Sequence, residues 1–289
     1  MKDIRIGIIG CGFVGSSVKE GLSDQYTAQV YDKYNSDKST VKTLEDLVLA
    51  SNIIFICLPT PMKPTGECDI RLVQDTIKEI DNISSDRNSS KKILVIKSTV
   101  PPNTTKTLQE STSAYCDIIF NPEFLTEANH IEDFKNQNRI ILGGDNCTHS
   151  LQIVKSMYMA KFPTVPYIIC GSLEAELTKY FSNCFLATKV SFANEMKQLC
   201  ESLGADYNRV VESSIYDKRI GNSHLAVPGP DGRRGFGGSC FPKDVNALIY
   251  TFEKNDVKPS LLKAVWEKNL EVRPEKDWEQ LKGRAVTDD

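Results

Sequence analysis

Short runs of apolar residues alternate with polar, helix-compatible stretches through residues 1–171. Each run is mostly continuously apolar, as expected for a parallel strand that is covered on both faces. Seven runs are predicted as strands: Ile4–Ile9, Ala28–Tyr31, Ile53–Leu58, Ile93–Lys97, Asp117–Phe120, Ile140–Leu142 and Tyr167–Cys170. The stretches between them predict helices over Val14–Ser23, Ile70–Ile83, Thr104–Ser111 and Thr148–Lys161. This alternation indicates a doubly wound α/β domain.

The pattern changes after Gly171, where a long helical segment begins. Ser172 is expected to cap a helix over Leu173–Leu203, and Gly204 to end it. Further helices are predicted over Asp206–Ser214, Lys243–Lys254 and Ser260–Glu271. The glycine-rich interval 221–238 contains two prolines and cannot be regular structure. Residues 172–272 therefore predict a smaller α-helical domain, and the charged tail 273–289 is expected to fray or dock weakly.

Composition narrows the class of protein. With 289 residues, 40% hydrophobic and 25% charged, the chain resembles a globular protein with a substantial core. Its 35 basic and 38 acidic residues give no basic footprint for nucleic acid, and no apolar run is long enough to cross a membrane. Nine cysteines without a C-x-x-C pair argue against zinc and disulfides. We therefore expect a cytoplasmic protein with reduced thiols and no metal.

A glycine motif follows the first predicted strand and opens a helix. Gly10 permits a tight turn, Gly12 lets the backbone approach a pyrophosphate, and Gly15 allows close packing of helix and strand. Asp32 ends the second strand, where its carboxylate can bind both ribose hydroxyls and repel a 2′-phosphate. The motif therefore predicts a Rossmann-like domain that binds NAD rather than NADP, although the neighbouring Lys33 weakens that preference. A tight turn without a ligand is the alternative.

Cys240 differs from the other eight cysteines because it lies in the glycine-rich loop 235–240 and directly precedes a predicted helix. A helix N-terminus and the nearby Lys243 both favour a thiolate, which is the form that acts as a nucleophile. The remaining cysteines are expected to be small buried apolar residues.

Two further clusters carry chemical groups. The segment 121–127 follows a strand and offers Glu123 and Glu127, which suit general-base work. Lys179 and Asn183 lie four residues apart on the long helix and so share one face, where they could hold an oxyanion. The alternative for either cluster is a solvated helix face.

Together these segments resemble the UDP-glucose/GDP-mannose dehydrogenase family. The resemblance covers nearly the whole chain, and its most specific motif is GFGGSCFPKD at 235–244. The other matching motifs are GCGFVG at 10–15, LPTP at 58–61, STVPP at 98–102, NPEFLTE at 121–127, the helix segment at 174–196 and RIGNSH at 219–224.

The resemblance implies an NAD-dependent four-electron oxidation of UDP-glucose to UDP-glucuronate. Cys240 matches the thiolate that forms a thiohemiacetal and then a thioester. Lys179 and Asn183 match the residues that stabilise the oxyanion. Asp244 and Thr99 match a pair that positions water. Glu123 matches the carboxylate linked to thioester hydrolysis, and Glu127 one that contacts both substrate and cofactor.

The resemblance also implies the residues that line the binding sites, and a homodimer whose core is the long central helix. The sugar nucleotide is expected to contact Glu123, Phe124, Leu125, Glu127, Lys179, Asn183, Arg219, Phe236, Gly237, Gly238 and Cys240. NAD is expected to contact Gly10, Gly12, Phe13, Val14, Gly15, Asp32, Lys33, Pro59, Thr60, Ser98, Thr99, Glu127 and Lys243.

Several alternatives stay open. Members of this family usually continue into a third domain that binds UDP, whereas this sequence ends at Asp289, as a short form or as part of a longer chain. The substrate could be a UDP-N-acetylhexosamine or GDP-mannose, because those enzymes share the catalytic residues. A two-electron β-hydroxyacid dehydrogenase is disfavoured because it needs no nucleophilic Cys240. A catalytically silent NAD-binding module that dimerises with a full-length enzyme is the alternative outside the enzymes.

Overall fold

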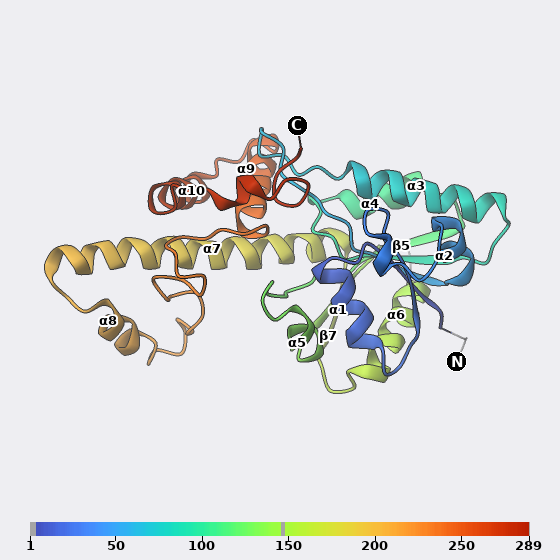
Figure 1. Cartoon of the computed structure of the whole chain (residues 1–289), viewed down its shortest axis with the longest axis horizontal. Helices are drawn as coiled ribbons and strands as arrows, with labels where there is room; N and C mark the ends of the chain where they lie inside the picture. Colours follow the sequence, from blue (N-terminus) through green and yellow to red (C-terminus); the bar gives the residue numbers. More distant parts are fainter. Residues whose placement is uncertain (1–3, 146–147, 289) are drawn as a thin grey trace. The chain divides into compact units, whose positions relative to one another are not determined.

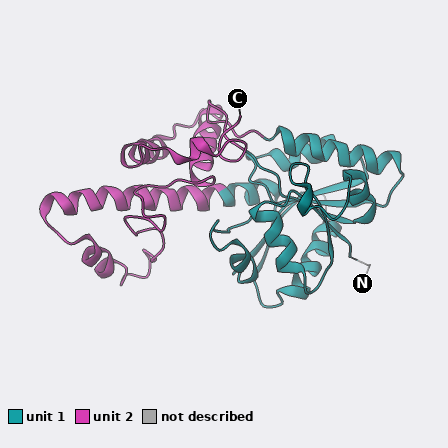
Figure 2. Ribbon diagram, viewed as in Figure 1, with its two compact units in different colours: residues 1–60, 70–179 teal, residues 61–69, 180–289 magenta. Residues whose placement is uncertain are grey.

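The computed structural model describes residues 4–145 and 148–288. Contacts between residues divide the chain into two compact units, shown in two colours in Figure 2. Unit 1 comprises residues 1–60 and 70–179, and unit 2 comprises residues 61–69 and 180–289.

Unit 1 is built on a seven-stranded sheet with the order β2-β1-β3-β4-β5-β6-β7. The strands are β1 Ile6–Ile9, β2 Ala28–Tyr31, β3 Ile53–Ile56, β4 Lys92–Ile96, β5 Cys116–Phe120, β6 Ile140–Gly143 and β7 Tyr167–Cys170. Neighbouring strands are parallel except β5 and β6, which pair antiparallel through Phe120 and Gly143. The predicted α/β fold and all seven predicted strands are thus confirmed, with that one antiparallel pair as the exception.

Helices cover both faces of this sheet (Figure 1). One face packs against α1 Phe13–Leu22, α5 His130–Lys135 and α6 Thr148–Lys161. The other packs against α2 Leu44–Ala50, α3 Arg71–Asp86 and α4 Thr104–Ser111. Because β1 has β2 on one side and β3 on the other, the strand order reverses there. Ligands of doubly wound sheets bind at such a reversal, beyond the carboxyl ends of the strands.

Two short helices of unit 1, α2 and α5, were not predicted from the sequence. The first has a recognisable start, because the Asp46 N–H donates to Thr43 Oγ1 at 3.0 Å and the Thr43 N–H donates to Asp46 Oδ2 at 3.1 Å. This reciprocal capping box was readable in the sequence. In contrast, α5 has six residues, too few for a helical period to show.

The long helix α7 Ser172–Leu203 begins in unit 1 and continues into unit 2. Unit 2 also contains α8 Tyr207–Ser214, α9 Phe241–Lys254 and α10 Ser260–Val272. The helix α9 begins two residues before the predicted start, and Pro242 lies in its first turn, where a missing N–H costs nothing. No helix among the described residues is both long and apolar enough to cross a bilayer.

The expectation that the tail frays or docks weakly is wrong for the described residues up to 288. The Arg273 guanidinium is 2% exposed and donates to Asp277 Oδ1 at 2.6 Å and to Asp231 Oδ2 at 2.7 Å. Trp278, on the short 3-10 helix η2 Asp277–Gln280, is 1% exposed. The buried Trp278 side chain and the ion-paired Arg273 guanidinium therefore hold the tail in place, although its high charge had predicted that it would fray.

Candidate functional site

Loops at the carboxyl ends of neighbouring strands form the candidate site in unit 1. Ser98 Oγ, after β4, accepts from the Leu58 N–H at 2.9 Å and donates to the Leu58 carbonyl at 2.7 Å. Thr60 Oγ1 donates to the Thr99 carbonyl at 2.8 Å. The loops after β3 and β4 are thus bonded to each other, and this places Thr60, Ser98 and Thr99 together, as the NAD prediction requires.

The three glycines of the loop after β1 match the roles expected of them: a tight turn at Gly10, open space at Gly12 and close helix–strand packing at Gly15. Gly10 has φ +85°, and a Cβ there would lie 2.5 Å from the Cys57 carbonyl oxygen. A Cβ on Gly15 would lie 1.9 Å from the Gly10 oxygen, whereas a Cβ on Gly12 would meet no described atom within 4 Å. Gly12 also precedes α1 without a side-chain cap, so the N–H groups of the first turn face an open space.

Asp32 directly follows β2 and supports the glycine loop. Its Oδ2 accepts from the Cys11 N–H at 2.7 Å, and its Oδ1 accepts from the N–H groups of Tyr34 and Asn35. The Lys38 ammonium donates to the Cys11 carbonyl at 3.0 Å. Lys33, which the sequence analysis singled out, is exposed, and the cation bonded to this loop is Lys38.

Lys179 and Glu123 form a buried ion pair in unit 1. The Lys179 ammonium lies 3.0 Å from Glu123 Oε1 and also donates to the Glu123 carbonyl oxygen. Glu123 Oε2 accepts from the Leu125 N–H at 2.7 Å. Burial alone would raise the pKa of Glu123, but Lys179, the Leu125 N–H and Lys97 outweigh it and hold that pKa below its usual range. Glu123 therefore stays a carboxylate.

Two cations lie near the ring of Phe124, and one of them is Lys179 of this pair. The Arg139 guanidinium is 4.0 Å from the centre of its ring, and the Lys179 ammonium is 5.3 Å away. A cavity of about 250 Å³ is lined by Glu123, Phe124, Leu125 and Arg139 among others. The structure therefore brings three residues of the predicted substrate segment to one concave surface.

A buried lysine that the sequence analysis did not identify also lines this cavity. Lys97 donates to Asn121 Oδ1 at 3.0 Å, and the Tyr158 hydroxyl donates to the same oxygen at 2.7 Å. Burial lowers the pKa of Lys97 to about 8, although Cys57 and Glu123 oppose this shift. Lys97 directly precedes Ser98 and Thr99 in the sequence, and this position was the signal that could have identified it as a site residue.

Glu176 is a second residue that the sequence analysis missed. It is fully buried, and its carboxylate accepts from the Asn103 and Thr105 N–H groups, both at 2.7 Å. Asn103 precedes α4 with φ 73° and caps the helix with no side-chain bond of its own, so Glu176 acts as the cap from α7. Glu176 lies three residues, or about one helical turn, before Lys179, and this E-x-x-K spacing was the signal that could have identified it.

In unit 2, Cys240 occupies the N-cap position of α9. Its sulfur lies 3.8 Å from Ser239 Oγ. Asp244, in the first turn, is 1% exposed and accepts from Asn183 Nδ2 at 2.6 Å and from the Lys243 ammonium at 2.5 Å. Burial would lower the pKa of Lys243, but the Asp244 carboxylate outweighs it and raises that pKa. Cys240, Lys243, Asp244 and Asn183, all predicted as site residues, are thus close neighbours at the N-terminus of α9.

The loop before Cys240 is held by residues that no motif indicated. The Phe236 N–H donates to Asn269 Oδ1 at 2.7 Å, and Asn269 Nδ2 donates back to the Phe236 carbonyl at 2.9 Å. The Gly238 N–H donates to Asp277 Oδ2 at 3.0 Å. A Cβ on Gly237 would lie 2.4 Å from Arg273 Nη2. Helix α10 and the tail therefore fix the backbone of the predicted substrate loop.

Arg219 does not join this group among the described contacts of unit 2. Its side chain is 90% exposed, and its guanidinium binds both oxygens of the Asp217 carboxylate in a bidentate pair. Glu127 in unit 1 is also exposed. Their predicted contacts with substrate stay predictions.

Comparison with known proteins assigns both parts of the chain. The pattern of the UDP-glucose/GDP-mannose dehydrogenase family, NAD binding domain, matches residues 18–161, and that of the central domain of the same family matches residues 173–271. The chain belongs to the UDP-glucose/GDP-mannose dehydrogenase family. The resemblance stated from its motifs is confirmed.

Individual members of the family give the same result. The UDP-glucose 6-dehydrogenase of Rickettsia bellii is 41% identical over 75% of this chain and 49% of its own length. TuaD of Bacillus subtilis, also a UDP-glucose 6-dehydrogenase, is 35% identical over 93% of this chain and 63% of its own length. The structure of a UDP-glucose dehydrogenase from Pyrobaculum islandicum superposes with a TM-score of 0.85 at 30% identity, over 96% of this chain and 70% of that one. This family member spans about half to two thirds of the curated relatives it matches.

The residues of unit 1 fit the NAD that this family domain binds. The open space at Gly12 leaves room for a pyrophosphate above the uncapped start of α1. Asp32 is partly exposed, so its carboxylate can accept from ribose hydroxyls while it holds the glycine loop. Among the described residues, no group of three or more His, Cys, Asp and Glu side chains could hold a metal ion.

Proposed function

We propose that this chain catalyses the NAD-dependent oxidation of the C6 hydroxyl of UDP-glucose to the carboxylate of UDP-glucuronate. The observation that carries the proposal is the group around Cys240, a thiol at the start of α9. In the first turn of that helix, the Asp244 carboxylate accepts from Lys243 and from Asn183 of α7. Such a thiol can tether an aldehyde so that a second oxidation occurs at the same carbon. Bound NAD would accept one hydride in each of two steps.

In the proposed reaction, the Cys240 thiolate adds to the C6 aldehyde and forms a thiohemiacetal. Loss of a hydride and a proton from that adduct leaves a thioester on Cys240. Water then adds to the thioester carbonyl, the C–S bond breaks, and the acid and the Cys240 thiol are released. We assign the oxyanion of each adduct to Lys179 and Asn183. One N–H of Asn183 Nδ2 binds Asp244, and among the described residues the second is left to donate.

We assign the hydrolytic water to Asp244, Thr99 and Glu123. Glu123 supports this role because Lys179 keeps its pKa low, and a carboxylate that stays ionised can accept a proton from water. Glu127 and Arg219 are assigned to the substrate, and Lys243 to the cofactor, on the motifs alone. We further propose a cytoplasmic homodimer, since none of the eight described cysteines is in a disulfide and α7 presents exposed aromatic side chains.

The stoichiometry of the reaction tests the proposal. The purified chain is mixed with excess NAD and limiting UDP-glucose, and NADH absorbance is followed to completion. Two NADH per sugar are expected. One NADH per sugar would indicate a two-electron dehydrogenase instead. No NADH with UDP-glucose, but two with GDP-mannose or a UDP-N-acetylhexosamine, would reassign the substrate. No turnover with any of them while NAD binds would support the silent module.

Substitution of the thiol tests the mechanism. Cys240→Ser should abolish formation of the acid and leave NAD binding unchanged. Cys170→Ser is the matched control, because Cys170 is the other described cysteine of intermediate exposure and lies in β7. Full acid production by Cys240→Ser, or an equal loss in Cys170→Ser, would contradict the assignment.

A further inference from the structure

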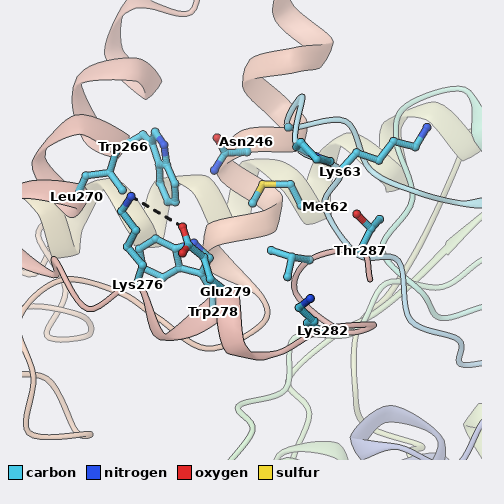
Figure 3. Close-up of a pocket in the computed structure, with 13 residues that line it drawn as sticks. Met62, Lys63, Asn246, Trp266, Leu270, Lys276, Trp278, Glu279, Lys282 and Thr287 are labelled. Carbon is cyan, nitrogen blue, oxygen red and sulfur yellow. Dashed lines mark ion pairs between the residues drawn. The ribbon is translucent and has the colours of Figure 1, made fainter. Parts of the chain in front are cut away.

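A cavity of about 380 Å³ lies in unit 2, lined by α9, α10, the tail and residues of the segment 61–69. Figure 3 shows the side chains around it. None of the residues assigned above to NAD or to the sugar nucleotide lines this cavity. Small-molecule sites usually enclose about 300–1,000 Å³, so the cavity matches the small end of that range.

Two indoles form the aromatic part of the wall. The ring centres of Trp266 and Trp278 are 5.2 Å apart, and their planes are tilted by 51°. Trp278 is buried at 1% exposure, whereas Trp266 is partly exposed. Met62 and Leu270 add apolar surface. A partly exposed indole beside apolar side chains is a surface on which a planar ring can stack.

Positive charge exceeds negative charge around the cavity. Lys63, Lys276 and Lys282 line it, against Glu279 as its one lining carboxylate, and Lys63 pairs with the neighbouring Glu67 at 2.8 Å. Lys276 and Glu279 lie 3.8 Å apart, as the dashed line in Figure 3 marks. Within the described part of the chain, Lys282 is exposed and forms no ion pair. This excess occurs in a chain with a net charge of −3, so it marks a local attraction for an anion.

One amide oxygen gives the cavity a directional polar group. Asn246 Nδ2 donates to the Pro242 carbonyl at 2.8 Å, and this fixes the side chain. No described residue donates to Asn246 Oδ1, which can therefore accept from a ring N–H. Stacking surface, a fixed acceptor and the exposed Lys282 ammonium are complementary to a planar base that carries a phosphate.

We propose that this cavity binds a nucleoside monophosphate, with the base against Trp266 and the phosphate at Lys276 and Lys282. The volume suits a mononucleotide rather than a dinucleotide. An aliphatic anion would leave the indole face and Asn246 unused. The proposal is independent of the proposed function, because it concerns binding alone and uses residues outside the catalytic group.

Tryptophan fluorescence tests this proposal directly, since Trp266 and Trp278 are the two tryptophans of the whole chain and both line the cavity. Titration of the full chain with UMP, excited selectively at tryptophan, should give saturable quenching. Uridine, which lacks the charge, should bind about tenfold more weakly, and inorganic phosphate should quench little. Lack of saturable quenching by UMP, or equal binding of uridine, would overturn the proposal.

Lysine variants locate the phosphate. Lys282→Ala should weaken UMP binding about tenfold, as expected for the loss of one charged hydrogen bond. Lys258→Ala is the matched control, an exposed lysine of unit 2 that does not line the cavity, and its affinity should be unchanged. Both side chains are exposed, so neither variant should disturb folding, and circular dichroism verifies this. Unchanged affinity in Lys282→Ala, or an equal loss in both variants, would contradict the placement.

Discussion

The Lys179 ammonium lies 3.0 Å from the Glu123 carboxylate, and the two side chains are 4% and 8% exposed. Removal of one partner from such a pair strands a charge away from water, which costs about 3–5 kcal/mol. We therefore expect Lys179→Met to lower the free energy of unfolding by about that amount, and urea denaturation measures it. Lys135→Met is the control, since its exposed pair with Glu132 should contribute less than about 1 kcal/mol. Equal losses in both variants would contradict a buried pair.

Alanine substitution at two positions of the glycine loop should have two different effects, one on stability and one on NAD binding. Gly15→Ala would place a Cβ 1.9 Å from the Gly10 oxygen, so α1 must shift, and we expect a loss of about 1–3 kcal/mol in stability. Gly12→Ala meets nothing within 4 Å and has an ordinary φ of −75°, so it should fold normally. Its methyl group would occupy the space left for the pyrophosphate and should weaken NAD binding at least about tenfold. Thermal unfolding and NAD titration separate the two effects, and normal NAD affinity in Gly12→Ala would contradict the placement of the cofactor.

Glu176 gives the fold a pH dependence with a definite sign. Burial raises its pKa from 4.5 to about 7; the Asn103 and Thr105 N–H groups oppose this shift, and the Asp145 carboxylate adds to it. The folded state therefore retains a proton that the unfolded chain releases at lower pH. The contribution of Glu176 to stability is complete below pH 4.5 and is lost as the pH rises through about 7.

Glu176→Gln removes this titration. The free energy of unfolding of the wild type minus that of the variant should fall by about 3 kcal/mol as the pH rises across that window. Denaturant unfolding at several pH values measures the difference. Glu132→Gln, at an exposed position, should give a nearly flat difference. A difference for Glu176→Gln that rises with pH would show that the N–H bonds, rather than burial, dominate.

The sheet could be predicted because its strands are covered on both faces and so leave continuous apolar runs. Ala28–Tyr31 and Tyr167–Cys170 match their predicted bounds residue for residue. The antiparallel pairing of β5 with β6 left no trace, since an apolar run carries no direction. The short helix α5 depends on packing of Phe134 rather than on a helical period.

In the candidate site too, features set by the local sequence could be predicted, whereas features set by distant contacts could not. Residues in local motifs, such as Gly12 and Cys240, could be identified because their backbone neighbours define the chemistry. Asn269 and Asp277 could not, because they act on Phe236 and Gly238 from more than thirty residues away. Lys97 and Glu176 lie inside predicted elements next to residues that motifs identify. Their pKa shifts arise from burial, and the sequence does not show how deeply each side chain is buried.

The central helix predicts an interface between two copies of the chain. On α7, Phe181, Phe185 and Phe192 are 73%, 57% and 62% exposed, and the first two rings stack at 6.1 Å. Exposed aromatic residues with helical spacing indicate a face that another molecule covers. We expect a dimer in sedimentation velocity at micromolar concentration, and a monomer for Phe185→Lys. Leu261→Lys, at a leucine of α10 that is 67% exposed, should stay dimeric. A monomeric wild type, or dissociation by both variants, would place the interface elsewhere.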